Sequence, residues 1–103
     1  MGRSRERGLI SLLTVKYSNL FKKDYKLMKK RGRNIKLLQE VIEILANNKT
    51  LPAKYKDHIL LGNFSGYREC HIQSDWLLIY KINKNELILT AFRTGTHSDL
   101  YKK

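Results

Sequence analysis

The chain has 103 residues, 42% of them hydrophobic, with a single proline, so we expect one folded domain and exclude a disordered or low-complexity chain. Its 21 lysines and arginines outnumber nine acidic residues and give a formal net charge of +12. Such a surface attracts polyanions, and the charge alone leaves nucleic acid, an anionic membrane surface and an acidic protein as candidate partners.

Residues 1–12 are charged, contain glycines and lack a clear periodicity, so we predict an N-terminal arm or extension followed by one domain over 13–103. The apolar run at 8–13 is too short for a signal peptide and no small-residue cleavage site follows it, so we do not expect export. We expect no membrane partner, because no segment approaches the roughly 20 apolar residues that cross a bilayer. The single cysteine, Cys70, excludes an internal disulfide and fits a reducing compartment, which favours a cytoplasmic location.

The first part of the domain predicts a strand followed by a helical hairpin. Residues 13–17 alternate between apolar and polar, which is typical of a strand. Ser18 can cap a first helix, Gly32 ends it, and Asn34 can cap a second. The apolar stripe of the first helix is Phe21, Tyr25 and Met28. That of the second is Ile35, Leu38, Val41, Ile42 and Leu45.

The second part predicts a loop and three strands. Residues 51–63 are irregular, which indicates a loop, and this loop carries His58. Strands are predicted over 67–72, 76–82 and 86–94, and the short links between them favour antiparallel pairing. The order strand, helix, helix, strand, strand, strand predicts an α+β fold, with the helical hairpin packed on one face of a twisted antiparallel sheet and the other face partly open.

The three histidines, His58, His71 and His97, all lie in the second half of the chain. Imidazole both accepts and donates protons near neutral pH. RNA can be cut without a metal when a base takes the ribose 2′-OH proton and an acid protonates the departing 5′ oxygen, so three histidines favour ribonuclease chemistry. A single histidine in such a position is more often an exposed or hydrogen-bonded structural residue, and this alternative stays open.

The same residues argue against a bound metal or cofactor. The histidines lie far apart in the sequence, no short ligand pair is present, and the lone Cys70 cannot complete a usual zinc set. We therefore expect neither a metal site nor a cofactor.

Basic and aromatic residues offer candidate RNA contacts. Lys22, Lys23 and Lys26 belong to a basic run on the first predicted helix, which could also be an ordinary solvated face. Trp76 and Tyr101 lie near the histidines in the sequence, and their rings could stack on unpaired bases. For Trp76, a place in the protein core is at least as good an explanation.

Four strings from residue 51 onward resemble those of YafQ-type toxins of the RelE superfamily, which are bacterial endoribonucleases paired with an antitoxin. The similarity spans about residues 15–101 and is carried by Leu51-Pro52-Ala53-Lys54-Tyr55-Lys56-Asp57-His58, Gly66-Tyr67-Arg68-Glu69-Cys70-His71-Ile72, Asp75-Trp76-Leu77-Leu78-Ile79-Tyr80 and Arg93-Thr94-Gly95-Thr96-His97-Ser98-Asp99-Leu100-Tyr101. The resemblance implies a RelE-like fold, cleavage of mRNA on the ribosome, and an antitoxin whose acidic segment wraps the basic surface.

Matched residue by residue, the family's catalytic positions correspond here to His58, His71, Asp75 and His97. Where the family motif usually ends in phenylalanine, this chain has Tyr101, which keeps a ring for stacking on a base and adds a hydroxyl.

We interpret His97 and His71 as the main proton-transfer groups, Asp75 as an orienting group and His58 as a third acid or base. Arg68 and Arg93 could steady the phosphate, because a guanidinium matches two phosphate oxygens, or could be ordinary exposed strand residues.

Two other functions fit parts of the sequence. A non-catalytic basic module that binds RNA or the ribosome would need the charge and the aromatic rings but no proton transfer. A gyrase-poisoning relative would share the scaffold but not the histidine and aspartate set.

Overall fold

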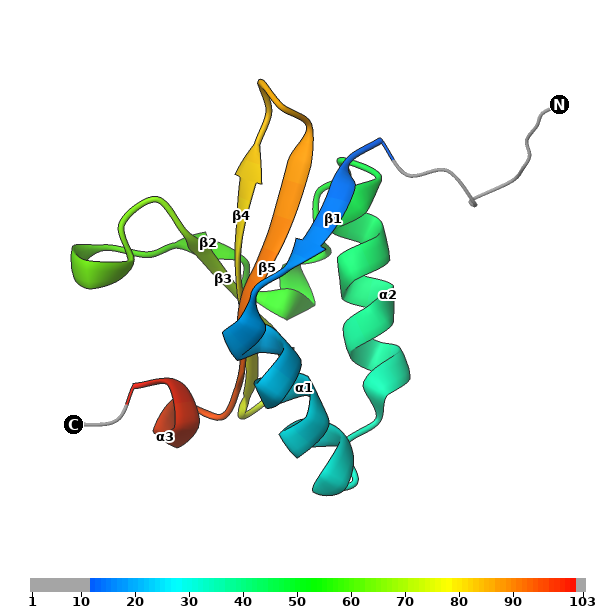
Figure 1. Ribbon diagram of the computed structural model, residues 1–103, viewed down its shortest axis with the longest axis vertical. Helices are drawn as coiled ribbons and strands as arrows, with labels where there is room; N and C mark the ends of the chain where they lie inside the picture. The colour runs from blue at the N-terminus through cyan, green and yellow to red at the C-terminus, as the bar shows by residue number, and fades with distance from the viewer. Residues whose placement is uncertain (1–11, 102–103) are drawn as a thin grey trace, which may run out of the picture.

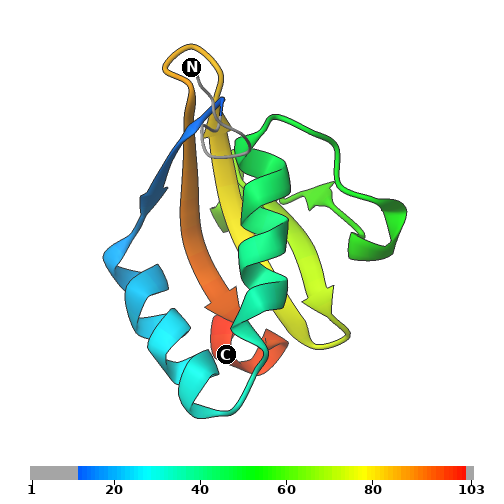
Figure 2. The same ribbon diagram turned by 90° about the vertical axis from the view of Figure 1, so that its right-hand side faces the viewer.

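The computed structural model describes residues 12–101, so the predicted arm of residues 1–12 lies outside the described residues except for Leu12. The regular elements follow in chain order as β1 Thr14–Tyr17, α1 Asn19–Lys30, α2 Ile35–Ala46, η1 Ala53–Tyr55, β2 His58–Ile59, η2 Gly62–Phe64, β3 Arg68–Gln73, β4 Trp76–Asn83, β5 Ile88–Gly95 and α3 His97–Leu100. Helices α1 and α2 cover one face of the sheet, and α3 lies beyond the end of β5 (Figures 1 and 2).

Among the described residues the strands form one sheet in the order β1-β5-β4-β3-β2. The α+β fold is confirmed, and β3, β4 and β5 pair antiparallel through short links as predicted. The prediction of a wholly antiparallel sheet is wrong for β1, which pairs with β5 in parallel from Thr14 opposite Ile88 to Tyr17 opposite Ala91. A short link forces antiparallel pairing only on consecutive strands, and β1 meets β5 after the rest of the domain has intervened.

Both predicted helix starts are confirmed. The Ser18 hydroxyl accepts a hydrogen bond from the Phe21 N–H at 2.9 Å, and the Asn34 Oδ1 accepts one from the Lys36 N–H at 3.1 Å. After α1 the chain turns through Gly32 at φ +84°, a left-handed conformation that glycine adopts without steric cost. None of the helices over 12–101 has the length and apolar character needed to span a bilayer.

The main core lies between the helices and the sheet. Both predicted helical stripes face this core, with Tyr25 and Ile35 partly exposed at its margin. Alternate residues of β4 point into it, which places Trp76, Leu78 and Tyr80 among the helices' apolar side chains. Cys70 is buried there too, and burial raises the pKa of its thiol, as expected for an apolar filler.

A second, smaller apolar cluster lies on the opposite face. It is centred on Leu77, Ile79 and Leu100, with part-buried residues packed around them: Leu60, Phe64, Tyr67, Phe92 and Tyr101. The predicted loop of residues 51–63 contributes to it and contains β2, a strand too short to show alternation in the sequence. This cluster forms the floor on which the candidate site lies.

Candidate active site

The three histidines lie together on the sheet face opposite α1 and α2. The ring centroids of His58 and His71 are 6.4 Å apart, and those of His71 and His97 are 6.0 Å apart. The Tyr101 ring lies 6.2 Å from that of His97. Residues far apart in the sequence therefore form one continuous row of rings, with His71 in the middle.

The strands explain why these side chains share a face. Glu69 and His71 are two residues apart on β3, so both point to the same side of the sheet. His58 on β2 lies directly opposite Glu69 in the antiparallel pair. The register between β3 and β4 shifts between His71 and Gln73, just before the turn that carries Asp75.

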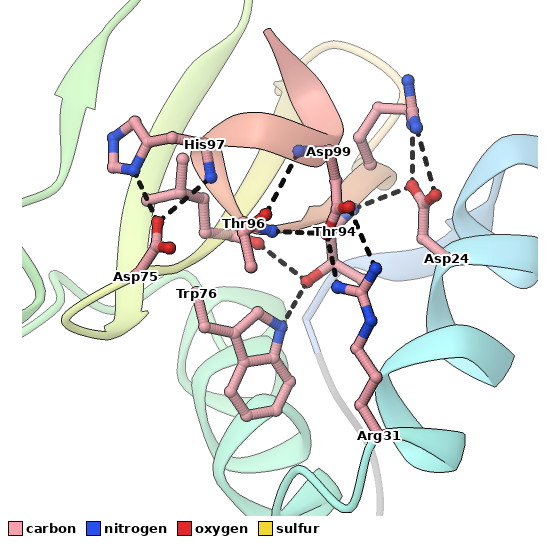
Figure 3. A network of polar contacts seen from close by, with 10 residues as sticks. Asp24, Arg31, Asp75, Trp76, Thr94, Thr96, His97 and Asp99 are labelled. Atoms are coloured by element: carbon pink, nitrogen blue, oxygen red, sulfur yellow. Dashed lines mark hydrogen bonds and ion pairs between the residues drawn. The ribbon is translucent and has the colours of Figure 1, made fainter. Parts of the chain in front are cut away.

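His97 is held by Asp75 through two contacts. The Asp75 Oδ1 lies 2.8 Å from the His97 Nδ1 and accepts the His97 backbone N–H at 3.1 Å (Figure 3). The contacts with the His97 side chain and backbone hold the pKa of Asp75 below its ordinary value, so the carboxylate stays charged. The His97 side chain remains 55% exposed, which leaves the ring accessible to a large substrate.

Glu69 is a member of the site that sequence reasoning missed. The residue is 5% exposed; its carboxylate accepts a hydrogen bond from the Tyr101 hydroxyl, and its Oε1 lies 3.3 Å from the His58 Nε2. The signal that could have found it is its position two residues before His71 on a predicted strand. Burial and the bond to Glu69 raise the pKa of Tyr101, so the phenol stays protonated as the donor.

His58 has both ring nitrogens engaged. The Nδ1 lies 2.8 Å from the Lys56 carbonyl oxygen, which can only accept, so this nitrogen carries a proton. The Nε2 then faces the Glu69 carboxylate, and that contact is a hydrogen bond only when a proton lies between the two atoms. His58 and Glu69 together can therefore hold a proton that the substrate could receive.

Trp76 does not belong to the site, so its prediction as a base-stacking residue is wrong. The residue is 0% exposed, and its Nε1–H donates to the Thr94 Oγ1 at 2.9 Å inside the main core. The alternating β4 residues place its ring on the helix side of the sheet, where the Arg33 guanidinium lies 5.8 Å from the ring centroid. RNA cannot reach this ring in the folded protein.

The structure also separates Arg68 from the histidines. Arg68 alternates with Glu69 and His71 on β3 and forms an ion pair with Asp57, which also accepts the Tyr80 hydroxyl at 2.5 Å. Burial and the bond to Asp57 raise the pKa of Tyr80, so its phenol stays protonated. The Arg68 guanidinium ties the loop before β2 to β3, and a phosphate contact by Arg68 stays a prediction.

Arg93 has a structural partner. Its Nε donates to the buried Asp24 of α1 at 2.7 Å, and the same Asp24 oxygen accepts the Thr94 backbone N–H at 3.1 Å (Figure 3). Asp24 thereby accepts a backbone N–H at the edge of β5, beyond the residues that pair with β1. A phosphate contact by Arg93 stays a prediction.

The predicted lysines lie elsewhere. Lys22 and Lys26 line an open groove of about 560 Å³ between α1 and α2, on the far side of the sheet from the histidines, and Lys23 is exposed on the same helix. A second cleft, of about 370 Å³, opens at the end of β3, and its lining includes His71, Lys54, Lys56 and, from α2, Leu37. The basic residues nearest the histidines are thus not those on the first helix.

Within residues 12–101 no group of three or more histidine, cysteine or acidic side chains is arranged to hold a metal ion. The arrangement offers the half-exposed His97 imidazole held by a charged carboxylate, the half-exposed His58 imidazole beside a buried carboxylate, and the partly buried His71 imidazole near both. Such a set can move protons in both directions at a phosphodiester.

Comparison with known proteins gives consistent matches over nearly the whole domain. A profile of the family described as "Bacterial toxin of type II toxin-antitoxin system, YafQ" matches residues 13–102. The mRNA interferase toxin YafQ of Escherichia coli strain K12 is 43% identical over 88 residues, which cover 84% of this chain and 94% of the relative.

Solved structures agree with this match. The crystal structure of the Escherichia coli DinJ–YafQ toxin–antitoxin complex is similar with a TM-score of 0.80 at 42% identity, covering 87% of this chain and 98% of the matched one. A metal-bound toxin from Helicobacter pylori has a TM-score of 0.81 at 45% identity, covering 85% and 98%.

Proposed function

The chain belongs to the YafQ family of toxins of type II toxin–antitoxin systems and is an mRNA interferase, an endoribonuclease; we propose that the histidine face cuts messages bound to the ribosome. The observation that carries this proposal is the row of His58, His71 and His97 beside Asp75 and Glu69 on the face opposite the helices. Ribosomal messages would place the toxin's action in the cytoplasm.

His97 is the proposed general acid. Asp75 occupies its Nδ1 and its backbone N–H, which leaves the Nε2 to give a proton to the departing 5′ oxygen. This is the division of labour that a carboxylate and histidine pair commonly shows.

His71 is the proposed general base. It lies between the other two rings, so a ribose bound over the row would have its 2′-OH close to this imidazole. The base takes the 2′-OH proton, the 2′ oxygen bonds to phosphorus, and the bond from phosphorus to the 5′ oxygen breaks as His97 protonates it. The products are a 2′,3′-cyclic phosphate and a free 5′-OH.

His58 and Glu69 support this step at the other end of the row. Their shared proton can be donated to a non-bridging phosphate oxygen, where negative charge builds up in the transition state. The cleft beside His71, with Lys54 and Lys56 on its rim, offers cationic groups to the phosphates flanking the cut. Tyr101, whose ring lies next to His97, is placed to stack on a base at the site.

The helix side of the molecule suits the antitoxin. The DinJ–YafQ relative is solved as a toxin–antitoxin complex, and we propose that this chain likewise forms a complex with a cognate acidic antitoxin. The α1–α2 groove has an apolar floor that includes Phe21 and Ile42, and its rim carries three lysines. An amphipathic acidic segment would bury its apolar side chains there and pair its carboxylates with Lys22, Lys26 and Lys29.

The acid assignment is tested with His97→Ala in a single-turnover assay of a ribosome-bound message. We expect cleavage to slow by about 10²- to 10⁴-fold, the range for loss of one proton-transfer group. A message with sulfur in place of the bridging 5′ oxygen has a leaving group that needs no proton, so it should restore most of the lost rate. Ser98→Ala is the matched control on the same helix, and undiminished cutting by His97→Ala would refute the assignment.

A further inference from the structure

Helix α3 carries His97 but is too short to hold itself in place. It consists of the four residues His97–Leu100, and isolated helices of this length are unstable in water. A capping box closes its first turn, in which Asp99 accepts the Thr96 N–H at 2.9 Å and the Thr96 hydroxyl accepts the Asp99 N–H at 3.1 Å. The box shapes the turn but does not fix where the turn lies relative to the sheet.

Leu100 packs against Leu77 and Ile79 of the sheet, and a contact from α1 adds a second, directional attachment of the turn. Arg31, the C-cap residue of α1, donates from Nη1 to the Asp99 Oδ2 at 2.8 Å and from Nη2 to the Asp99 Oδ1 at 3.1 Å (Figure 3). Two parallel bonds fix both the distance and the angle between a guanidinium and a carboxylate. One carboxylate therefore closes the turn of α3 and joins that turn to a helix 68 positions away in the sequence.

The end of β5 also lies close to Asp99, through Gly95. A Cβ added to Gly95 would lie 3.0 Å from the Asp99 Cβ and 3.1 Å from the Asp99 Oδ2, a tight contact that would push Asp99 away by a few tenths of an ångström. Glycine at this position therefore leaves room for the close approach of Asp99 to the strand. Strand, turn and helix α1 thus meet at one carboxylate, two residues from His97.

We infer that Arg31 is a positioning residue for cleavage: its bidentate pair with Asp99 holds the α3 turn so that His97 meets Asp75. This inference rests on the proposed role of His97 and adds to it a residue from the C-terminal end of α1. Arg31 acts through Asp99 and touches neither Asp75 nor His97.

The exposure of the pair distinguishes positioning from simple stabilisation. The Arg31 side chain is 41% exposed, and surface ion pairs contribute little to the free energy of unfolding. Catalysis is more sensitive, because a displacement of about 1 Å can slow a reaction by about 10²-fold. Loss of the pair should thus change the cleavage rate more than the folding equilibrium.

The experiment compares Arg31→Ala with Lys30→Ala, which removes the same charge from the neighbouring residue of α1. We expect Arg31→Ala to lower the single-turnover rate at saturating toxin by about 10- to 100-fold, with the half-saturating concentration and the urea midpoint nearly unchanged. Lys30→Ala should keep the wild-type rate. Arg31→Lys should recover part of the rate, because an ammonium can pair with Asp99 but cannot form the two-pronged contact.

A second measurement follows the geometry itself. Nuclear magnetic resonance titration of Asp75 should show its pKa rising toward the ordinary value in Arg31→Ala, because a displaced His97 no longer donates to it. The charged groups facing Asp75 are His97 and, at longer range, Arg33, and both remain in the variant. Lys30→Ala controls for the loss of a positive charge.

Two results would overturn the inference. One is a raised half-saturating concentration with an unchanged single-turnover rate, which would make Arg31 an RNA-binding residue. The other is a normal rate and an unshifted Asp75 in Arg31→Ala. If His97→Ala also cut normally, the proposed function would fail with it; if only His97→Ala were inactive, the failure would belong to the Arg31 inference alone.

Discussion

The two faces of the sheet use their polar residues in opposite ways. Away from the histidines, two arginines of the sheet pair fully within the protein: Arg68 with Asp57 on the helix side, and Arg93 with Asp24 at the edge of β5. On the opposite face, His58 and His97 are each paired with a carboxylate through one ring edge while about half of each side chain stays exposed. Internal pairing stabilises the fold, whereas partial pairing leaves atoms for a substrate.

Strand β3 shows how the same backbone serves both purposes. Arg68 and Cys70 point to the helix side, and Glu69 and His71 point to the site. Substitutions one residue apart should therefore have different consequences, and the comparison can be tested by measuring cleavage and unfolding on the same variants.

The largest expected effect is on cleavage by His71→Ala. Loss of the proposed base should lower the single-turnover rate by about 10²- to 10⁴-fold, while the free energy of unfolding changes by less than about 1 kcal/mol. Urea unfolding on the same sample measures the free energy of unfolding. A large loss of stability with a normal cleavage rate for the folded protein would show that His71 stabilises the fold and does not act in cleavage.

Trp76→Ala should have the reverse signature. Truncating this fully buried ring should cost about 3–5 kcal/mol in unfolding free energy, with the cleavage rate per folded molecule nearly unchanged. Trp76→Phe keeps most of the packing and loses the bond to Thr94, so it should cost about 1 kcal/mol and serves if the alanine variant does not fold. A specific loss of RNA binding by a folded Trp76→Phe would contradict its burial.

Tyr101→Phe tests a polar contact within the histidine face, with a smaller expected effect. Removing the hydroxyl deprives the buried Glu69 of a donor, which should cost about 1–3 kcal/mol of unfolding free energy. The ring remains for stacking, so the half-saturating concentration should not change. A raised half-saturating concentration would show that the hydroxyl itself contacts RNA.

Asp99→Asn has the smallest expected effect on stability, and its sign depends on pH. The hydrogen bonds from Arg31 hold the pKa of Asp99 below its ordinary value of 3.8 in the folded protein. The ion pair therefore contributes fully at pH values above 3.8, and its contribution is lost as the pH falls through the lowered pKa. The free energy of unfolding, measured with urea, should be higher for wild type than for Asp99→Asn by less than about 1 kcal/mol at pH 7. This difference should be smaller at pH 3. A gap that widens on acidification would contradict the pairing.

Features set by neighbouring residues were predictable from the sequence. Ser18 and Asn34 cap helices because their own side chains reach the next turn, and the strands joined by short links pair antiparallel as expected. The parallel pairing of β1 could not be predicted, because it depends on the register with a strand more than 70 residues later.

The site was predictable in part for the same reason. His58, His71, Asp75 and His97 were identified from resemblance, and the structure brings them together. Glu69 was missed because its partner Tyr101 is distant in the sequence, and α3 was missed because four residues give no periodicity. Trp76 was a candidate for base stacking because it lies near the histidines in the sequence, but the alternation along β4 places it with Leu78 and Tyr80 in the core, the alternative that the sequence left open.

The most direct test of the central claim uses a ribosome-bound message that carries a single 2′-deoxynucleotide at the cleaved position, with the all-ribose message as control. Histidine acid–base catalysis by this face requires the 2′ oxygen as the nucleophile, so the modified message should stay intact while the control yields a 2′,3′-cyclic phosphate end. Cleavage of the modified message at the same position and rate would contradict the mechanism.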